Sequence, residues 1–167
     1  SSWVDLGTYA DANGKTEFYG FAFKIDLKSL VWDAPEQFED NGYDIPSTME
    51  ELIELSDKMV EDGNTPWCIG VESGNATGWT ATDWMEDLML RTTSPENYDR
   101  WVSNDLPFNS PEVLNAMEVY GQFSRNDDYV AGGASSVATT FFGDAPKGLF
   151  SSPASCLMHR QASFIPA

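Results

Sequence analysis

The sequence predicts an α/β fold in which a small sheet is flanked by helices. Three observations support this prediction: a few short strand candidates, several longer segments with helical periodicity between them, and turn residues that separate the two kinds of segment. The chain has 167 residues, of which 41% are hydrophobic and 13% aromatic, so it can build one hydrophobic core. We therefore expect a single domain over residues 1–167.

The strand candidates are short runs of aromatic, aliphatic or β-branched residues. Before the first of them, residues 3–10 resemble the end of a helix that stops before the turn pair Asn13-Gly14. Strands are expected over residues 18–23, 29–32, 66–71 and 157–165.

The clearest helix is expected over residues 48–62. Overlapping capping boxes at Ser47–Glu51 precede apolar residues at helical spacing. Ser94 and Ser110 each stand before a proline and a glutamate, which is a typical helix start. The face of the 48–62 helix that packs on the sheet is expected to hold Met49, Leu52, Ile53, Leu55 and Met59. Further helices are expected over residues 36–40, 85–90 and 139–142, the second of them fed by the segment 78–84.

The charge of the chain excludes several classes of partner. Twenty-seven acidic and nine basic residues give a formal net charge of -18, which repels nucleic acids and anionic membrane surfaces. A solvated acidic surface accounts for this charge, whereas the spacing of the carboxylates does not support a cation-binding face. No apolar run approaches the ~20 residues that span a bilayer.

The sequence contains no recognisable cofactor, metal or nucleophile motif. The single histidine, His159, has no adjacent nucleophile pattern, and no Cys/His spacing suits zinc. We therefore expect neither cofactor nor metal, and no catalytic residue is assigned. A glycoside hydrolase needs two well-placed carboxylates, so a hydrolase fragment remains the alternative function, with a sugar-binding interaction module third.

Cys68 and Cys156 are the only cysteines, and each follows an apolar or extended stretch. Their spacing is as compatible with two buried free thiols as with one disulfide.

Several segments resemble family 1 extracellular solute-binding proteins, which include maltose-binding protein, and most closely the alpha-glucoside-binding branch. They are residues 15–39, residues 45–52 with the helix start Ile-Pro-Ser-Thr-Met-Glu-Glu-Leu, residues 78–84, and residues 158–164. The similarity covers essentially the full length. Family members are longer and have two α/β lobes with sugar in the cleft between them, so this chain resembles a central fragment that covers mostly the second lobe of a type II periplasmic-binding-protein-like fold.

The resemblance implies a non-catalytic carbohydrate-binding component of an ABC importer, with an alpha-glucoside or related oligosaccharide as ligand. It also implies a membrane permease as partner of the full-length protein, and a periplasmic or extracellular location, with or without a lipid anchor. In an exported protein the two cysteines, which the family places in one sheet, are expected to form a disulfide. A single lobe exposes apolar surface, so we expect a homodimer or domain swap and weakened sugar affinity.

Aromatic faces and planar polar groups recognise sugars, and Trp79 is the aromatic candidate in the first half of the chain. It lies in a glycine-rich loop, where it either contacts ligand or acts as a hydrophobic staple. Thr77 and Asp83 flank it. Asp83 either binds sugar hydroxyls or caps the next helix, and capping is the simpler role. The tryptophans expected to be structural are Trp32, Trp67, Trp84 and Trp101.

The remaining ligand candidates lie at strand ends. Asp26 and Lys28 lie between two strand candidates, and the resemblance implies that this crossover supplies an acidic side chain to the sugar, which favours Asp26 over a solvated edge. Arg160 and Gln161 interrupt an apolar strand, and we expect Arg160 to be ion-paired with a carboxylate in preference to a ligand contact. Phe164 falls where family members carry an aromatic that stacks on sugar.

Overall fold

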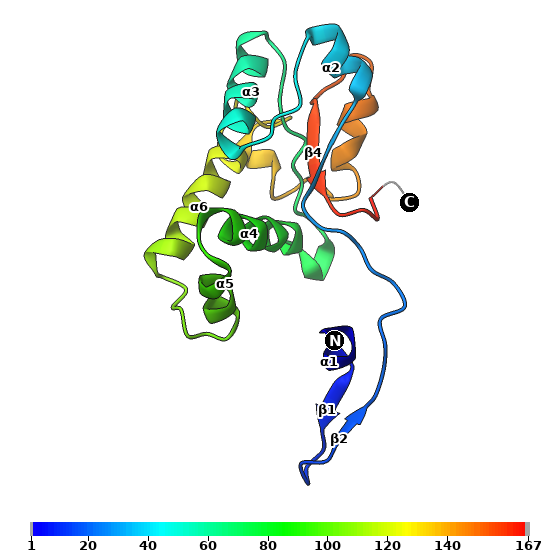
Figure 1. Ribbon diagram of the computed structural model, residues 1–167. Coiled ribbons are helices and arrows are strands. Elements are labelled where there is room, and N and C mark those ends of the chain that lie inside the picture. The colour runs from blue at the N-terminus through cyan, green and yellow to red at the C-terminus, as the bar shows by residue number, and fades with distance from the viewer. Residues whose placement is uncertain (1, 166–167) are drawn as a thin grey trace.

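A small sheet lies at the centre of the main body of the molecule (Figure 1). The computed structural model describes residues 2–165. Strand β3 (Leu30–Asp33) pairs antiparallel with β4 (Met158–Gln161), so that Val31 lies opposite Arg160 and Asp33 opposite Met158. Because side chains alternate along a strand, Met158 and Arg160 share one face of β4.

Two further extended segments widen this sheet. The Cys68 amide donates to the Met158 carbonyl oxygen (2.8 Å), so residues 66–68 run parallel to β4. On its other side, the Trp67 amide donates to the Tyr129 carbonyl oxygen (2.8 Å). Residues 66–71 were expected to form a continuous strand, but they form only isolated parallel bridges. In these bridges Trp67 pairs with Met158 on one side and with Val130 on the other.

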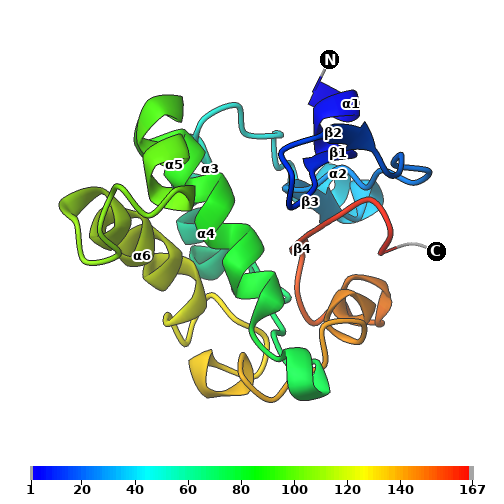
Figure 2. The ribbon, with the colours of Figure 1, turned by 90° about the horizontal axis from the view of Figure 1, so that it is seen from below.

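Helices cover this sheet. The α4 helix lies between β4 and the pair formed by α5 and α6 (Figure 2). Helices α4 and α6 pack against each other. The helices of the main body are α2 (Pro35–Asn41), α3 (Met49–Glu61), α4 (Trp79–Thr92), α5 (Pro95–Val102) and α6 (Pro111–Ser124), with short 3-10 turns at Gly74–Ala76, Ala134–Ser136 and Ala145–Phe150.

The helix predicted over residues 48–62 is confirmed as α3. Thr48 is its N-cap: its Oγ1 accepts from the Glu51 amide, and the Glu51 carboxylate accepts in return from the Thr48 amide. This reciprocal pairing satisfies donors that the first turn otherwise leaves unpaired. The expected apolar face is also confirmed, since Leu55 and Met59 are buried and Met49, Leu52 and Ile53 pack against the core.

Trp67 is the centre of the hydrophobic core. It is fully buried, and its ring makes edge-on contacts with Trp84 (5.6 Å between centroids) and Phe123 (5.3 Å). Its indole Nε1 donates to the Ser56 Oγ of α3 (3.0 Å), so the polar edge of the ring is satisfied inside the core. The structural role predicted for Trp67 and Trp84 is confirmed.

Residues 2–27 extend away from the main body (Figure 1). They contain α1 (Ser2–Leu6) and a hairpin of β1 (Thr8–Ala10) and β2 (Thr16–Phe18), joined by a turn that includes the expected Asn13-Gly14 pair. We call residues 2–27 the N-terminal arm. The helix expected over residues 3–10 ends at Leu6, because residues 8–10 pair with residues 16–18 instead.

Two predicted elements are wrong. Residues 19–23 form no strand: the Tyr19 amide donates to the Gly7 carbonyl oxygen (2.8 Å), but within residues 2–165 no backbone pairing continues over residues 20–23. Residues 139–142 are not helical: the Glu72 amide donates to the Thr140 carbonyl oxygen and the Phe142 amide donates to the Glu72 carbonyl oxygen (both 3.0 Å). This backbone pairing with residue 72 replaces the bonds of a helical turn.

Candidate functional site

An aromatic cluster forms where α4 begins. Trp79 is the first residue of this helix, and its ring lies 5.0 Å from that of Phe142 and 5.9 Å from that of Phe164, between centroids. Gly78, the N-cap, has a φ of 100°, a conformation that favours glycine. Its amide donates to the Val71 carbonyl oxygen (2.8 Å), which fixes the chain just before Trp79.

Lys28 brings a positive charge to these rings. Its Nζ lies 5.1 Å from the centroid of Trp79 and 5.7 Å from that of Phe164, within the range of cation–π attraction. The same Nζ donates to Asp83 Oδ2 at 2.8 Å. We call the five residues Lys28, Trp79, Asp83, Phe142 and Phe164 the Trp79 cluster.

Asp83 does not cap α4, so the simpler role expected from the sequence is wrong. The helix begins at Trp79 with Gly78 as N-cap, and Asp83 lies one turn further on, on the same face as Trp79. As the fifth residue of α4, Asp83 lies too far into the helix for its carboxylate to reach the free amides of the first turn. Its carboxylate binds Lys28 instead.

The segment after β4 holds Lys28 beside Phe164. The Leu27 amide donates to Ser163 Oγ (3.0 Å), and the Ser163 amide donates to the Leu27 carbonyl oxygen (2.8 Å). These two bonds join segments that are 136 residues apart. Asp26 adjoins this junction, and its carboxylate lies 3.6 Å from Lys24 Nζ.

Thr77 and Gln161 use their polar atoms locally. Thr77 Oγ1 donates to the Gly74 carbonyl oxygen (2.8 Å) and accepts from the Ser73 amide (3.0 Å), which closes the turn before α4. Gln161 is buried, and its side-chain oxygen accepts from the Ala162 amide (2.8 Å). Within residues 2–165, no hydrogen bond, ion pair or ring contact joins either side chain to the Trp79 cluster.

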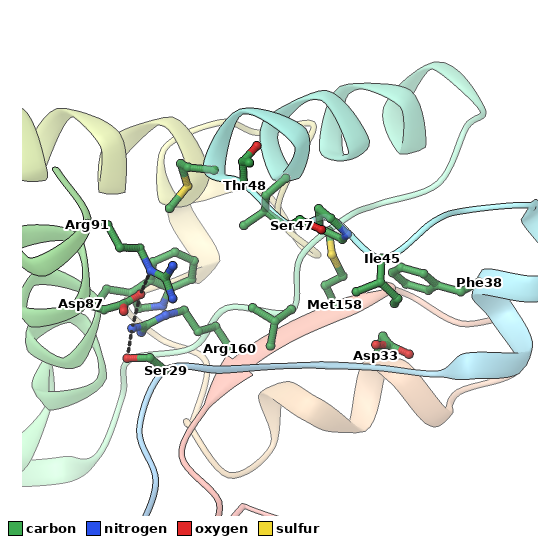
Figure 3. Close-up of a pocket in the computed structure, with 15 residues that line it drawn as sticks. Ser29, Asp33, Phe38, Ile45, Ser47, Thr48, Asp87, Arg91, Met158 and Arg160 are labelled. Carbon is green, nitrogen blue, oxygen red and sulfur yellow. Dashed lines mark hydrogen bonds and ion pairs between the residues drawn. The ribbon is translucent and has the colours of Figure 1, made fainter.

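Arg160 reaches from β4 across to α4, as Figure 3 shows. Its guanidinium donates to Asp87 Oδ2 (3.1 Å), Ser29 Oγ (2.8 Å) and the Asp83 carbonyl oxygen (3.1 Å). The guanidinium carbon also lies 4.5 Å from the Trp84 ring centroid. The ion pair expected for Arg160 is therefore present.

Asp87 and Arg91 complete this network, and the sequence analysis missed both. Arg91 Nε donates to Asp87 Oδ2 at 3.0 Å, so one carboxylate oxygen receives two guanidinium groups. The signal was present in the spacing: Asp83, Asp87 and Arg91 recur every four residues and so share one helix face. Burial lowers the pKa of Arg160, and the charge of Asp87 opposes this shift.

A pocket of about 170 Å³ lies beside this network, between β3, α4 and the segment that leads into α3. Figure 3 shows Arg160 and Asp87 at one end and Phe38 with Ile45 at the other. Drug-sized ligands generally fill pockets of about 300–1,000 Å³. This pocket alone is therefore too small to enclose an oligosaccharide.

Cys68 and Cys156 form a disulfide, with 5.4 Å between their Cα atoms. Cys68 lies in the extended segment beside β4, and Cys156 lies between the 3-10 turn Ala145–Phe150 and the start of β4. The disulfide joins these two segments. Both cysteines are buried against Leu149 and the half-buried Trp32 and Ala131.

His159 lies beside this bridge and is almost fully buried. Its Nδ1 is 2.7 Å from the Cys68 carbonyl oxygen, and its Nε2 is buried without a hydrogen-bond partner within residues 2–165. Burial lowers the pKa of His159 below its ordinary value of 6.5. Burial therefore disfavours the charged imidazole in the folded protein.

The burial of His159 predicts an acid-dependent loss of stability. The unfolded chain takes up a proton near pH 6.5 and the folded chain only at lower pH, so protonation favours unfolding as the pH falls below 6.5. Relative to the non-titrating variant His159→Asn, the wild type should lose at most about 1.4 kcal/mol per pH unit. Denaturant unfolding between pH 7 and 5 measures this difference, and parallel curves for the two proteins would contradict it.

Within residues 2–165 there is no group of three or more His, Cys, Asp or Glu side chains placed to hold a metal ion. None of the helices in the same range combines the length and apolar character needed to cross a membrane.

No family model matches the chain, but curated relatives do. The chain is 60% identical over 166 residues to the alpha-glucosides-binding periplasmic protein AglE of Rhizobium meliloti (strain 1021), covering 99% of this chain and 36% of that protein. It is 47% identical over 166 residues to the osmoprotective compounds-binding protein GgtB of Synechocystis sp., covering 99% of this chain and 38% of that protein. The chain thus spans little more than a third of the relatives it matches.

Solved structures support the same fold. The bacterial solute receptor AcbH, described with an exclusive preference for β-D-galactopyranose, superimposes with a TM-score of 0.69 at 22% identity, over 83% of this chain and 32% of that one. A chitin oligosaccharide binding protein gives a TM-score of 0.67 at 17% identity, over 83% of this chain and 33% of that one. The predicted α/β fold and the resemblance to solute-binding proteins are confirmed.

Proposed function

We propose that this chain forms one wall of a carbohydrate-binding cleft. It aligns with little more than a third of the length of the curated relatives AglE and GgtB. The ligand is an alpha-glucoside or a related oligosaccharide, and the full-length protein delivers it to the membrane permease of an ABC importer. The name of the relative AglE, an alpha-glucosides-binding periplasmic protein at 60% identity, supports both the ligand class and a periplasmic location.

The Trp79 cluster is the observation that carries this proposal. Sugars present C–H faces that pack on aromatic rings and hydroxyl groups that need charged or polar partners. Trp79 and Phe164 supply two half-buried rings, and Lys28 and Asp83 supply a donor and an acceptor beside them. Both kinds of contact therefore come together at one place on the surface.

The second wall of the cleft is proposed to come from the rest of the longer protein. We propose that residues 1–167 are mostly the second lobe of a two-lobe receptor, with the N-terminal arm directed toward the other lobe. The arm supports this assignment because Phe21 and Phe23 are 78% and 91% exposed, which is unusual for large apolar side chains in a complete domain.

Replacing Trp79 by alanine is expected to weaken binding of an alpha-glucoside by about tenfold or more, which corresponds to about 1.4 kcal/mol. The variant loses the stacking contribution of about 1 kcal/mol and, in addition, the apolar area that the ring buries against the sugar. Titration calorimetry on the wild type and Trp79→Ala measures the loss. Trp101→Ala is the matched control, since Trp101 packs on the core away from the cluster. Equal affinities for wild type and Trp79→Ala would contradict the proposal.

Product analysis of the same samples separates binding from hydrolysis. The relatives are named as binding proteins, and we propose that this chain binds sugar without cleaving it. The sugar should be recovered unchanged by chromatography after prolonged incubation. Release of glucose that tracks the protein concentration would contradict this.

The exposed arm also predicts self-association of this chain. We propose that, without the rest of the longer protein, the arm residues cover one another between two copies, because large exposed apolar patches associate in water. Light scattering should give a mass above that of a monomer, and Phe21→Ser with Phe23→Ser should restore the monomer. Phe108→Ser with Phe150→Ser, at exposed sites of the main body, is the control and should leave the mass unchanged. A monomeric wild type would overturn this proposal.

A further inference from the structure

The Trp79 cluster has the composition of a site for organic cations. Quaternary ammonium groups are held in proteins by aromatic faces, and a nearby carboxylate adds charge attraction. Trp79 and Phe164 offer two such faces with 5.9 Å between their centroids, and Asp83 lies on the same side of α4 as Trp79. The side chain of Asp83 is only 17% exposed, so its charge is partly shielded from water.

The ammonium group of Lys28 occupies the position that a cationic ligand would take between these two rings and Asp83. Lys28 Nζ lies 5.1 Å and 5.7 Å from the two ring centroids and 2.8 Å from Asp83 Oδ2. One ammonium group thus contacts all three groups that would hold a cationic ligand. The Lys28 side chain is 48% exposed, so the ammonium group makes these contacts at the surface of the molecule.

The backbone keeps Lys28 at this place. The bonds between Leu27 and Ser163 fix the residue before Lys28 to the residue before Phe164. A tethered group of this kind competes with a free ligand at a high effective concentration. A free cation must therefore displace Lys28, whereas a neutral sugar can accept a hydrogen bond from it.

We infer that Lys28 is a specificity-determining residue: its ammonium group fills the cation position between Trp79, Phe164 and Asp83 and thereby reserves the site for neutral, hydroxyl-bearing ligands. This inference rests on the proposed function only in placing the ligand at the Trp79 cluster. The exclusion of cations follows from the contacts of Lys28 itself.

The test uses the whole chain with the variant Lys28→Met, which keeps an apolar stem and removes the charge. Lys24→Met is the matched control, because Lys24 is a neighbouring lysine that pairs with Asp26 and, within the described residues, lies over no aromatic ring. Tetramethylammonium chloride is the probe, with sodium chloride at the same ionic strength as the blank. Binding is read from the Trp79 indole N–H resonance, which is assigned by its loss in Trp79→Phe.

Lys28→Met should bind tetramethylammonium at least about tenfold more tightly than either the wild type or Lys24→Met, because two ring faces and Asp83 become free. The double variant Lys28→Met/Trp79→Ala should lose this gain. Lys28→Gln, which is polar but uncharged, should show the same gain and serves if the Met variant does not fold. Equal affinity of wild type and Lys28→Met, or a gain that survives Trp79→Ala, would overturn the inference.

A titration with an alpha-glucoside on the same samples keeps the two proposals apart. Lys28→Met should bind the sugar more weakly than the wild type, the opposite direction to its effect on the cation. Absence of any sugar response in the wild type would overturn the proposed function alone, since the cation measurements involve no sugar. A sugar response without any cation gain would overturn the role of Lys28 alone.

Discussion

Replacing Asp87 by alanine is expected to lower the free energy of unfolding by about 3–5 kcal/mol, because it leaves a buried guanidinium without its counter-charge. The side chain of Arg160 is only 4% exposed, and Asp87 is its carboxylate partner at 3.1 Å. Ser29 and the Asp83 carbonyl oxygen remain as uncharged hydrogen-bond acceptors. The Asp83 carboxylate raises the pKa of Arg160 less than Asp87 does and is itself paired with Lys28, so it does not replace Asp87. Denaturant unfolding of the variant measures the loss.

Two further variants separate burial from the mere loss of an ion pair. Asp144→Ala removes the partner of Lys147 in a pair whose side chains are 57% and 76% exposed, and should cost at most about 1 kcal/mol. The double variant Asp87→Ala/Arg160→Met also removes the stranded charge and should recover most of the stability. A similar cost for Asp87→Ala and Asp144→Ala would show that the buried network contributes no more than a surface pair.

Removing the disulfide is expected to have an effect of similar size. The bridge closes a loop across a sequence separation of 88 residues, and the restriction of the unfolded chain by such a loop contributes roughly 4 kcal/mol. The double variant Cys68→Ala/Cys156→Ala should therefore unfold at clearly lower denaturant concentration than the oxidised wild type.

Reduction provides the control for this prediction. A reducing agent should destabilise the wild type by a comparable amount and leave the double alanine variant unchanged, since the variant has no cysteine. Unfolding curves of the wild type that coincide with and without the reducing agent would contradict the predicted contribution of the bridge.

The sequence predicts those elements well whose signals are local. Helix α3 has a capping box and an apolar periodicity within its own residues, and α5 and α6 begin at Ser-Pro pairs whose serine side chains accept from the helix amides. The strand Leu30–Asp33 is also recovered. In each case a short window contains the residues that determine the structure.

Elements that depend on distant partners are predicted less well. The aromatic run over residues 19–23 has strand composition but lacks a strand to pair with, and residues 139–142 leave the helical pattern because they bond to residue 72. Strand formation requires a partner, and composition does not identify one. The close packing of Gly148 shows the same limit: a Cβ there would clash with Cys156 Sγ, which no local pattern reveals.

In the candidate site, too, the residues could be named from local sequence, whereas their contacts with distant segments could not. Lys28, Trp79, Asp83 and Phe164 are named from the sequence and the family resemblance, and they meet in the structure. What the sequence does not show is that Lys28 lies over both rings, since this depends on the bonds between Leu27 and Ser163 across the chain. Asp87 was missed because its partner Arg160 lies on a strand far away in sequence.

The most direct test of a sugar site at the Trp79 cluster is the indole N–H resonance of Trp79 during titration with an alpha-glucoside such as maltose or trehalose. We expect this resonance to shift saturably, while that of the buried Trp67 stays in place. A Trp79 resonance that does not move at sugar concentrations where calorimetry detects binding would show that the ligand lies elsewhere and contradict the account.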